Sequence, residues 1–321
     1  MRKITETRTG KIVTDTDLML EYLYVGDYGK ENNIKASFLG YNKRIDKVEH
    51  KSVNIADKLV VTVSTQKGCP MKCNFCDCSK LGFHGNASLP ELVSEITTAI
   101  SLSGIKKGNR LNVHYARMGE PTFNPDVIIS AVCIRDMVKN TKVSFNEYHP
   151  VVSTMMPAAN KNLEIFLNEW IKTGYVYGGK DGFGLQFSIN TLNEEDRNAM
   201  FDNKSLSLAE IGAMIDRLPR PKNRKFTLNF AVTSKSNLDP DLMEKYFDKT
   251  KCIVKITPIH ETVEAVNNGF EIVKDFDVYE KFEQPLVDRG WDVIVFVPSK
   301  EEDEDRITCG NSLIAIANEG K

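Results

Sequence analysis

The alternation of short β-rich runs with helical stretches is the feature that most constrains the fold of this chain. After about Leu59, six strand candidates follow one another, at residues 60–65, 111–117, 150–154, 183–190, 226–232 and 252–259. Between them lie stretches with apolar residues at helical spacing, at 89–102, 125–138, 160–173, 207–218 and 240–249. Several of these stretches open at Pro or Ser, which are signals of a helix N-terminus. Repeated strand–helix units predict a parallel sheet.

Six such units suit a partial (β/α)6 barrel of the α/β class better than a closed eight-stranded one. A last helix–strand pair is expected at 278–290 and 291–299. Residues 1–58, with short extended runs at 35–41 and 51–55, predict a small N-terminal β extension. Residues 59–321 are expected to form the barrel with a C-terminal strand and loop. The acidic run 300–305 is predicted to be a solvated loop.

Composition bounds the classes of function. The chain has 321 residues, 41% of them hydrophobic, which is enough to bury a substantial core. The net charge of about −2 gives no global basic field for nucleic acid, so RNA binding would rest on local basic segments, 217–225 and 105–110. A solvated face is an equal interpretation of those segments. The N-terminus lacks an apolar signal region and no long apolar run occurs, which predicts a cytoplasmic protein without membrane contact.

Four of the seven cysteines lie within ten positions: Cys69, Cys73, Cys76 and Cys78. An odd and unevenly clustered set does not resemble a secreted disulfide framework, and in a reducing compartment it indicates a metal site or a catalytic site. The cluster directly follows the strand candidate 60–65. A loop at the C-terminal end of a barrel strand is where such folds place their chemistry.

The first three thiols are spaced Cys69-x3-Cys73-x2-Cys76. A structural zinc site usually takes two pairs of ligands far apart in sequence, and no second pair is visible here. Cys78 could be a fourth ligand, but its spacing from Cys76 is tight for one tetrahedral ion. Three thiolates on a four-iron cluster leave one iron open, which suits catalysis. Zinc or another cluster remains the alternative at this point.

With Phe75 directly before the third cysteine, the segment CPMKCNFC resembles the cysteine loop of the radical S-adenosylmethionine (SAM) superfamily. The resemblance implies a partial barrel of the radical SAM type and a 4Fe–4S cluster bound by Cys69, Cys73 and Cys76. It implies SAM as the second cofactor, chelating the open iron and cleaved by an electron to methionine and a 5′-deoxyadenosyl radical. It also implies an electron donor such as flavodoxin or ferredoxin.

The segment ARMGEPTFN, residues 116–124, is similar to the GMGEP segment of the RlmN/Cfr family. That family methylates adenine of 23S ribosomal RNA, and RlmN also acts on tRNA. Further stretches resemble family segments in the same order, at 63–69, 187–197, 226–237, 252–261 and 305–313. The resemblance covers residues from about 45 to 315. It implies a methyltransferase of class EC 2.1.1 with rRNA or tRNA as partner.

The resemblance also implies roles for single residues. SAM contacts fall on residues at the ends of strands: Gly119, Glu120, Ser153, Ser188 and His260. His260 stands where the family has Asn, and Asn190 stands where the family has His. Cys309 matches the family cysteine that is methylated and becomes the carbon donor, and Glu49 matches a Glu near the reacting centre.

Two departures from the family are visible. The family has a second catalytic cysteine seven residues before the first cluster cysteine, and Thr62 occupies that position here. A hydroxyl cannot form the disulfide that releases product. No segment is expected to form the family's helical N-terminal RNA-binding domain or its basic helical tail. Cys78 and Cys252 have no family role, and Cys133 is expected to be a core residue.

Three hypotheses follow. The first is a radical SAM enzyme that methylates an RNA adenine through a methylated Cys309. The second is a radical SAM enzyme on the same scaffold that does not synthesise a methyl group and acts on a small molecule or peptide. The third is a non-catalytic iron–sulfur or zinc binding module. The MGEP segment and the spacing that leaves an iron open argue against the third.

Overall fold

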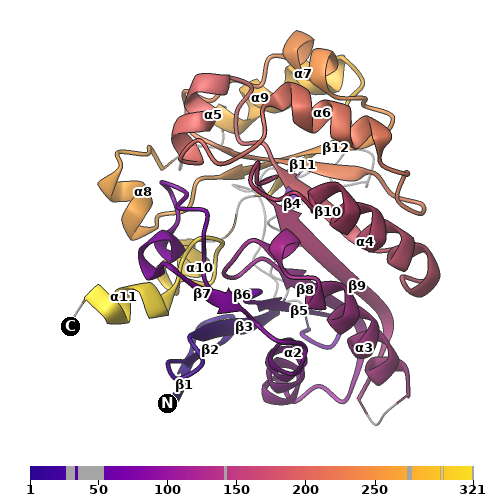
Figure 1. The fold of residues 1–321 in the computed structure, drawn as a ribbon, viewed down its shortest axis with the longest axis vertical. Helices are drawn as coiled ribbons and strands as arrows, with labels where there is room; N and C mark the ends of the chain where they lie inside the picture. Colours follow the sequence, from indigo (N-terminus) through magenta and orange to yellow (C-terminus); the bar gives the residue numbers. More distant parts are fainter. Residues whose placement is uncertain are drawn as a thin grey trace.

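The computed structural model describes residues 1–26, 33–34, 54–140, 143–272, 277–296, 298 and 300–319. One eleven-stranded sheet runs through them in the order β1-β2-β3-β5-β8-β9-β10-β11-β12-β13-β4 (Figure 1). Its consecutive strands from β5 to β13 are all parallel. Their bounds are Lys58–Val63 (β5), Lys107–Tyr115 (β8), Ser144–Thr154 (β9), Gly184–Ser188 (β10), Phe226–Val232 (β11), Cys252–Pro258 (β12) and Val293–Phe296 (β13). The predicted parallel sheet is confirmed.

The N-terminal segment extends this sheet. Strands β1 (Arg2–Glu6), β2 (Gly10–Asp15) and β3 (Leu20–Gly26) form an antiparallel meander, and β3 pairs antiparallel with β5. The short β4 (Asn33–Ile34) pairs antiparallel with β13 at the opposite edge. In the part of the chain that the structure describes, β1 and β4 do not pair with each other, so the barrel is partial, as predicted. The predicted extended run at 35–41 and residues 51–53 of the run at 51–55 lie outside the described residues, and residues 54–55 are not in a strand. The division at residue 58 stays a prediction.

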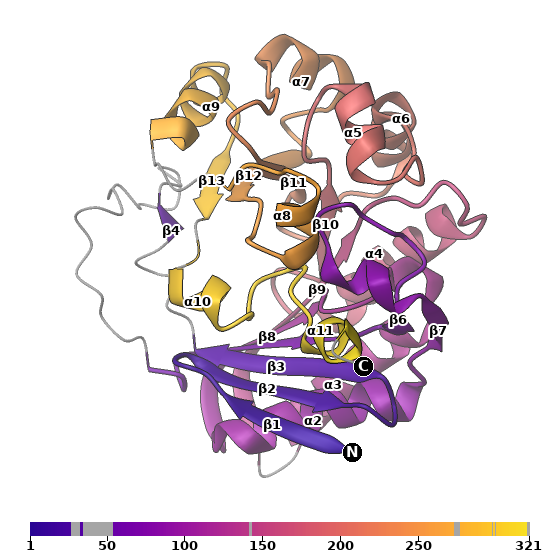
Figure 2. The same cartoon turned by 90° about the vertical axis from the view of Figure 1, so that its left-hand side faces the viewer.

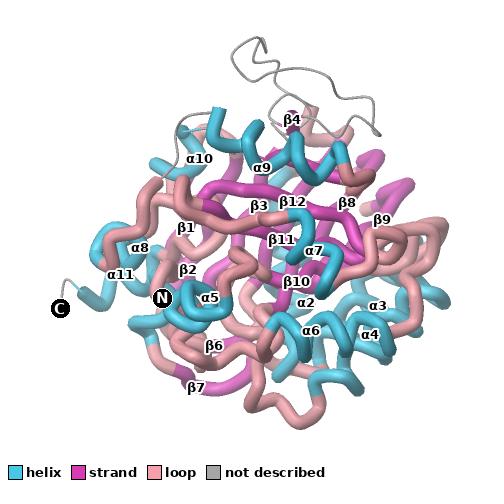
Figure 3. The backbone as a smooth tube through the Cα atoms, turned by 90° about the horizontal axis from the view of Figure 1, so that it is seen from above, coloured by secondary structure: helices cyan, strands magenta, loops and turns pink. Residues whose placement is uncertain are grey.

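The predicted helices are all present: α2 (Leu89–Ser103), α3 (Asp126–Asn140), α4 (Leu163–Tyr177), α6 (Leu208–Arg217), α7 (Pro240–Tyr246) and α9 (Asp277–Asp288). Helix α2 begins after a capping box in which Ser88 and Glu91 exchange hydrogen bonds. Figure 3 shows α2, α3, α4 and α6 along the outside of the strands. Among the described residues, no helix combines the length and the apolar character that a membrane span requires.

Several short elements escaped prediction. They are the hairpin β6 (Gln66–Gly68) and β7 (Phe83–Asn86), the 3-10 helices η3 (Asp77–Leu81) and η4 (Pro121–Phe123), and the helices α5 (Glu194–Met200), α8 (Val263–Asn267), α10 (Lys300–Glu304) and α11 (Leu313–Glu319). Figure 2 shows α8, α10 and α11 grouped on one side of the molecule. They are too short for an apolar period to identify them in sequence.

Burial alternates along the parallel strands, because successive side chains point to opposite faces of a sheet. On β5 the buried residues are Leu59, Val61 and Val63, which pack with the helices in the main core. The intervening residues are half-buried and line the inner face. In the core, the Trp170 ring lies 6.0 Å from Tyr115 and 4.9 Å from Phe183, and its Nε1 donates to the Gly184 carbonyl at 2.8 Å.

The prediction of a solvated loop at 300–305 is wrong. Residues Lys300–Glu304 form α10. Asp303 accepts hydrogen bonds from Thr308 and His260, and Arg8 donates to Asp305. The acidic run therefore serves as a set of acceptors that ties down neighbouring segments.

The prediction that Cys133 belongs to the core is also wrong, because this cysteine is exposed. The buried stripe of α3 comprises Val127, Ala131, Ile134 and Val138. These residues follow helical spacing. Cys133 precedes Ile134 by one residue, which turns its side chain by about 100° around the helix axis, away from the buried stripe.

Replacement of Trp170 by Ala is expected to lower the free energy of unfolding by about 3–5 kcal/mol, because it leaves a large cavity between the sheet and α4. Chemical denaturation followed by circular dichroism measures this change. Ile165, on the same helix but 64% exposed, is the matched control. Ile165→Ala should stay within about 0.5 kcal/mol of the parent, and equal effects of the two variants would contradict the assigned core.

Candidate functional site

The cysteine loop is held in a hairpin between β6 and β7. Gly68 ends β6 with φ of +77°, and a Cβ at that position would lie 1.9 Å from the Gly82 carbonyl oxygen. Only glycine fits this close approach in a left-handed conformation. The Cys69 amide donates to the same carbonyl at 2.7 Å. The first thiol therefore begins on a rigid stem.

The far end of the loop is anchored by residues distant in sequence. The Phe75 ring makes edge contacts with Phe201 at 5.7 Å and Phe270 at 6.2 Å. The Phe75 carbonyl accepts a hydrogen bond from the Thr262 hydroxyl at 2.8 Å. The Asn74 amide donates to the Met200 carbonyl at 3.0 Å. The aromatic residue before the third cysteine thus packs the loop against the segments after β10 and β12.

Cys69, Cys73 and Cys76 are half-buried on this loop. Burial raises the pKa of Cys69 to about 12 and that of Cys73 well above its usual value, and the charge of Cys76 adds to both shifts. Three thiolates here would repel one another unless a cationic group neutralised them, which fits the donor set of an iron–sulfur cluster. Among the described residues, no three His, Cys, Asp or Glu side chains lie in an arrangement that could hold a single metal ion. A four-iron cluster takes its thiolates at separate corners and does not need such a grouping.

Cys78 differs from the three. It is 1% exposed and packs with Leu81, Met118 and Ile314. Its thiol donates to the Arg117 carbonyl at 3.8 Å. Cys78 is therefore a core residue beside the loop.

The MGEP segment lies directly over the start of the loop. Gly119 has φ of +95°, and a Cβ there would lie 2.6 Å from the Gln66 Cβ. The Glu120 amide donates to the Gln66 side chain at 2.8 Å, and the Glu120 carboxylate accepts from Thr122 and from the Met155 amide. Burial raises the pKa of Glu120, and its charge in turn raises the pKa of Cys69 and of Cys73. The carboxylate thus lies within electrostatic range of two of the three thiols.

The structure brings Cys309 to the same place. The carbonyl of the next residue, Gly310, accepts from the Asp77 amide at 3.0 Å and from the Cys76 thiol at 3.8 Å. Cys309 itself is exposed. Burial by the surrounding protein raises its pKa to about 11, the charge of Cys76 adds to this, and the cations of Arg117 and Lys255 oppose it. The residue next to this exposed thiol therefore contacts the cysteine loop directly.

A buried ion pair fixes the segment that carries Cys309. Two guanidinium nitrogens of Arg117 donate to one carboxylate oxygen of Glu21, at 2.6 and 2.9 Å, and both side chains are at most 1% exposed. The remaining donors of Arg117 reach the carbonyls of Arg306, Ile307 and Thr308 at 2.9–3.2 Å. The second oxygen of Glu21 accepts from the amides at the start of α11, at 2.8 and 3.1 Å.

Comparisons with known proteins find relatives of this chain by sequence. The sequence matches no family model. It is 26% identical over 185 residues to the dual-specificity RNA methyltransferase RlmN of Wolinella succinogenes, covering 57% of this chain and 47% of the relative. It is 24% identical over 232 residues to the probable RlmN of Pseudothermotoga lettingae, covering 71% and 61%. The chain is related to the RlmN-type radical SAM proteins.

A solved structure shows the same fold. The radical SAM methyltransferase from Sphaerobacter thermophilus superposes with a TM-score of 0.66 and 17% sequence identity, over 98% of this chain and 81% of that one. The predicted α/β fold with an open, partial barrel is thereby confirmed. The chain spans about half the length of the RlmN sequences it matches, 47% and 49% for those of W. succinogenes and Nautilia profundicola.

The other positions that the RlmN resemblance singles out lie at the ends of neighbouring strands or just beyond them. Ser153 is on β9 and accepts from the Gln186 amide group at 3.2 Å. Ser188 ends β10. His260 follows β12, and its Nδ1 lies 3.0 Å from Asp303 of α10. Because the carboxyl ends of parallel strands meet at one edge, these residues share the edge that carries the cysteine loop. Their contact with SAM stays a prediction.

Thr62, at the position of the second catalytic cysteine of RlmN, is half-buried on β5, the strand that leads into the cysteine loop. Its neighbours in the sheet are Leu23 and His114. Glu49 lies outside the described residues, so its role stays a prediction.

Sequence reasoning missed Arg197 and Glu21, which are fully buried charges. Arg197 donates to the Leu206 carbonyl and the Ser205 hydroxyl, and its guanidinium covers the Phe201 ring at 5.0 Å. A charged residue in an amphipathic pattern normally indicates a solvated surface, so no sequence signal marks either residue as buried.

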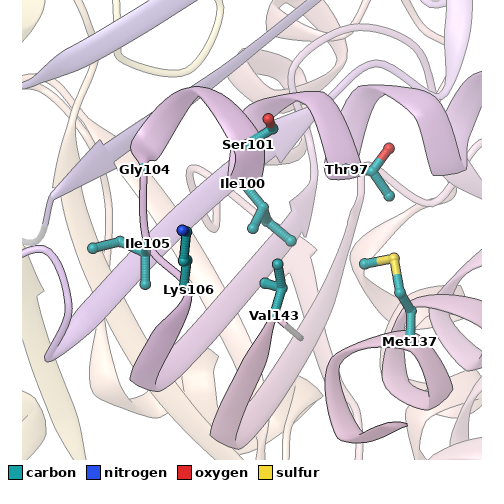
Figure 4. A pocket seen from close by; sticks show the side chains of 8 residues that line it. All are labelled: Thr97, Ile100, Ser101, Gly104, Ile105, Lys106, Met137 and Val143. Carbon is teal, nitrogen blue, oxygen red and sulfur yellow. The ribbon is translucent and has the colours of Figure 1, made fainter. Parts of the chain in front are cut away.

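A surface groove of about 240 Å³ lies away from this site (Figure 4). Side chains of Ile100, Met137 and Val143 point into it, and Lys106 lies at its side. It is beside the amino ends of β8 and β9, opposite the edge that carries the cysteine loop. It therefore has no part in the candidate site.

Replacing Arg117 by Met should leave Glu21 charged and buried, and we expect the free energy of unfolding to fall by about 3–5 kcal/mol. The carbonyls of residues 306–308 also lose their donors, so alkylation of Cys309 by iodoacetamide should quicken. Peptide mass spectrometry measures the alkylation, with the exposed Cys133 as internal reference. The control is Arg8→Met, which removes an exposed pair with Asp305 and Glu304. Equal stability and equal Cys309 labelling in both variants would contradict the anchoring role of Arg117.

Proposed function

We propose that this protein is a radical SAM enzyme that methylates an RNA adenine through a methylated Cys309. One observation carries the proposal: the Cys309 segment packs directly on the third cysteine of the loop. A Cβ added at Gly310 would lie 3.8 Å from the Cys76 Cα and 3.5 Å from the Phe75 carbonyl oxygen. Cys309 is brought there from more than 200 residues away in the chain.

The chain's own residues have separable tasks in this proposal. Cys69, Cys73 and Cys76 would hold a 4Fe–4S cluster, and Gly119 and Glu120 would frame the amino and carboxylate groups of SAM. When bound, the cluster with SAM supplies a carbon radical generated by one-electron cleavage.

Cys309 has the requirements of a methyl acceptor. It is exposed, and the cations of Arg117 and Lys255 partly offset the burial and the Cys76 charge that raise its pKa to about 11. A soft thiolate can accept a methyl group by direct displacement.

RNA as substrate is supported by the relatives, which are named dual-specificity RNA methyltransferases. An electron donor such as flavodoxin or ferredoxin and a cytoplasmic location belong to the same proposal, because a cluster with an open iron requires a reductant and a reducing compartment. In this proposal, Thr62 departs from the RlmN/Cfr pattern, which has a cysteine at this position. With a hydroxyl there, release of the product needs another thiol, and Cys78 is disfavoured because it is buried in a small core.

A second candidate function is radical chemistry on a small molecule. The basic segments 105–110 and 217–225 immediately precede or begin β8 and β11, so they lie at the amino ends of the strands, away from Cys309. Arg217 and Lys225 there are also paired with Glu164 and Asp292. RNA phosphates bound at Arg217 or Lys225 would not bring a base directly to the cysteine loop, which favours a smaller substrate.

The cluster is tested first. Anaerobically reconstituted protein should bind about four irons and four sulfides per chain. Replacing Cys69, Cys73 or Cys76 by Ala should abolish the reductive cleavage of SAM. Liquid chromatography of the product 5′-deoxyadenosine measures this cleavage. The matched control is Cys78→Ala, which removes a thiol from the same segment but not a predicted ligand. A colourless wild-type protein that never yields 5′-deoxyadenosine would overturn the radical SAM assignment.

Methylation of Cys309 is tested by mass. The Cys309 peptide from protein purified without oxygen should carry one added methyl group, and the Cys133 peptide should not. Cys309→Ala should retain SAM cleavage but lose methylation of RNA, whereas Cys133→Ala should retain both. Thr62→Cys should speed release of any protein–RNA adduct. If Cys309 is never methylated and Cys309→Ala stays fully active, the small-molecule candidate replaces the RNA methyltransferase.

A further inference from the structure

The inner face of the sheet carries cations that the proposed methyl transfer does not use. His114 on β8 and Lys255 on β12 are at half-buried positions of the strands. Asn229 on β11 lies beside Lys255 in the sheet register, and its side-chain oxygen is buried without a hydrogen-bond partner. The Lys255 ammonium lies 5.2 Å from the centre of the Phe296 ring. Within the described ranges, neither His114 nor Lys255 forms a side-chain hydrogen bond or an ion pair.

Arg224 reaches the same face from the turn before β11. Its two terminal nitrogens lie 3.1 Å from where a Cβ on Gly184 would be, and the Val151 side chain lies 2.8 Å from that point. Gly184 leaves the space into which the guanidinium extends. Gly184 is beside Val151 in the register, and Val151 is beside His114. Arg224 is half-buried, and in the described part of the chain its donors have no hydrogen-bond partner.

The charges of these groups also act on one another. Burial lowers the pKa of His114 to about 3, and the charges of Lys255, Lys58, Arg110 and Arg224 contribute to this shift. Burial likewise lowers the pKa of Lys255 to about 8, which the charge of Cys309 opposes. The charges of four cations thus act on one neutral imidazole, from β5, β8, β12 and the turn before β11.

Among the described residues, the acids near this region have other interactions. The charge of Asp181 acts on Arg224 but does not offset the lowering of its pKa by burial. Glu147 lies 4.0 Å from Arg110, which also donates to Asn112, so Arg110 has partners of its own. Lys58 likewise has an interaction elsewhere. In the described ranges, the groups without a hydrogen-bond or ion-pair partner are Arg224, Lys255 and His114, with the Asn229 amide beside them.

We propose that Arg224, Lys255 and His114, with Asn229, form a phosphate-binding subsite on the inner face of the partial barrel. The planar fork of Arg224 suits two phosphate oxygens, Lys255 supplies a compact charge, and neutral His114 and the Asn229 amide supply further donors. A single carboxylate would leave part of this set unused. Because the charge of Lys255 also acts on Cys309, the phosphate would belong to the nucleotide whose base faces that thiol. Only this assignment to a nucleotide rests on the proposed function.

Isothermal titration calorimetry of the reconstituted protein with inorganic phosphate tests the subsite. Wild-type protein should bind phosphate, and Arg224→Gln or Lys255→Gln should weaken binding about tenfold or more, as expected for lost charge-assisted hydrogen bonds. Arg224→Lys, which retains the charge but not the fork, should weaken it less. The matched control is Arg220→Gln, an exposed arginine of the same turn that donates to Thr250. It should change the affinity less than twofold.

Three results would overturn the subsite: no binding of phosphate to wild-type protein, equal weakening by Arg220→Gln, or unchanged binding in both the Arg224 and Lys255 variants. Circular dichroism of each variant shows whether it is folded. Adenosine 5′-monophosphate should bind more tightly than adenosine and lose that advantage in Arg224→Gln. Equal binding of the two would overturn the assignment to a nucleotide.

The titration needs neither SAM nor a reductant, so its failure is distinct from failure of the proposed function. Wild-type protein that cleaves SAM but does not bind phosphate contradicts only the subsite. Protein that binds phosphate through Arg224 and Lys255 but never cleaves SAM contradicts only the radical chemistry.

Discussion

The buried ion pair between Glu21 and Arg117 is the constraint on which the rest of the site depends. It joins three parts of the chain: the N-terminal meander, the segment after β8 and the C-terminal segment that carries Cys309. A buried pair is stabilising only when its remaining hydrogen-bonding capacity is satisfied. Here the surrounding carbonyls and amides of residues 306–314 do this. The hydrogen bonds that satisfy these two buried charges therefore fix the position of the Cys309 segment.

The two faces of the sheet differ in burial and in the kind of side chain they carry. Buried aliphatic and aromatic residues on the outer face pack with the helices, and the alternation of strand side chains leaves the inner face half-buried and polar. Thr62, His114, Asn229 and Lys255 all belong to that inner face. Because parallel strands end together, the loops that follow them bring the cysteine loop, the MGEP segment and His260 to one edge. In our proposals, the radical chemistry at that edge would adjoin a substrate bound on the inner face.

The packing of the cysteine loop decides which of its thiols are accessible. Gly68 and Gly119 allow backbone approaches that no side chain would permit, and Phe75 packs the loop against Phe201 and Phe270. Cys69, Cys73 and Cys76 are left half-buried by this packing, whereas Cys78 is drawn into a core. The difference between three accessible thiols and one buried thiol arises from the path of the loop, because all four share one short segment.

Much was determined by the sequence alone. The alternation of strand and helix periods was sufficient for the parallel partial barrel, since each period reflects which side chains must be buried. The spacing of Cys69, Cys73 and Cys76 and the MGEP segment indicated the RlmN relationship without any structure. Local patterns cannot show long-range partners, however. Only the tertiary structure placed Cys309 against the cysteine loop, buried Glu21 with Arg117, exposed Cys133, turned residues 300–304 into a helix and gathered Arg224, His114 and Lys255 on one face. These outcomes depend on contacts between residues tens to hundreds of positions apart, and a charged or polar side chain has the same local pattern whether it meets water or a buried partner.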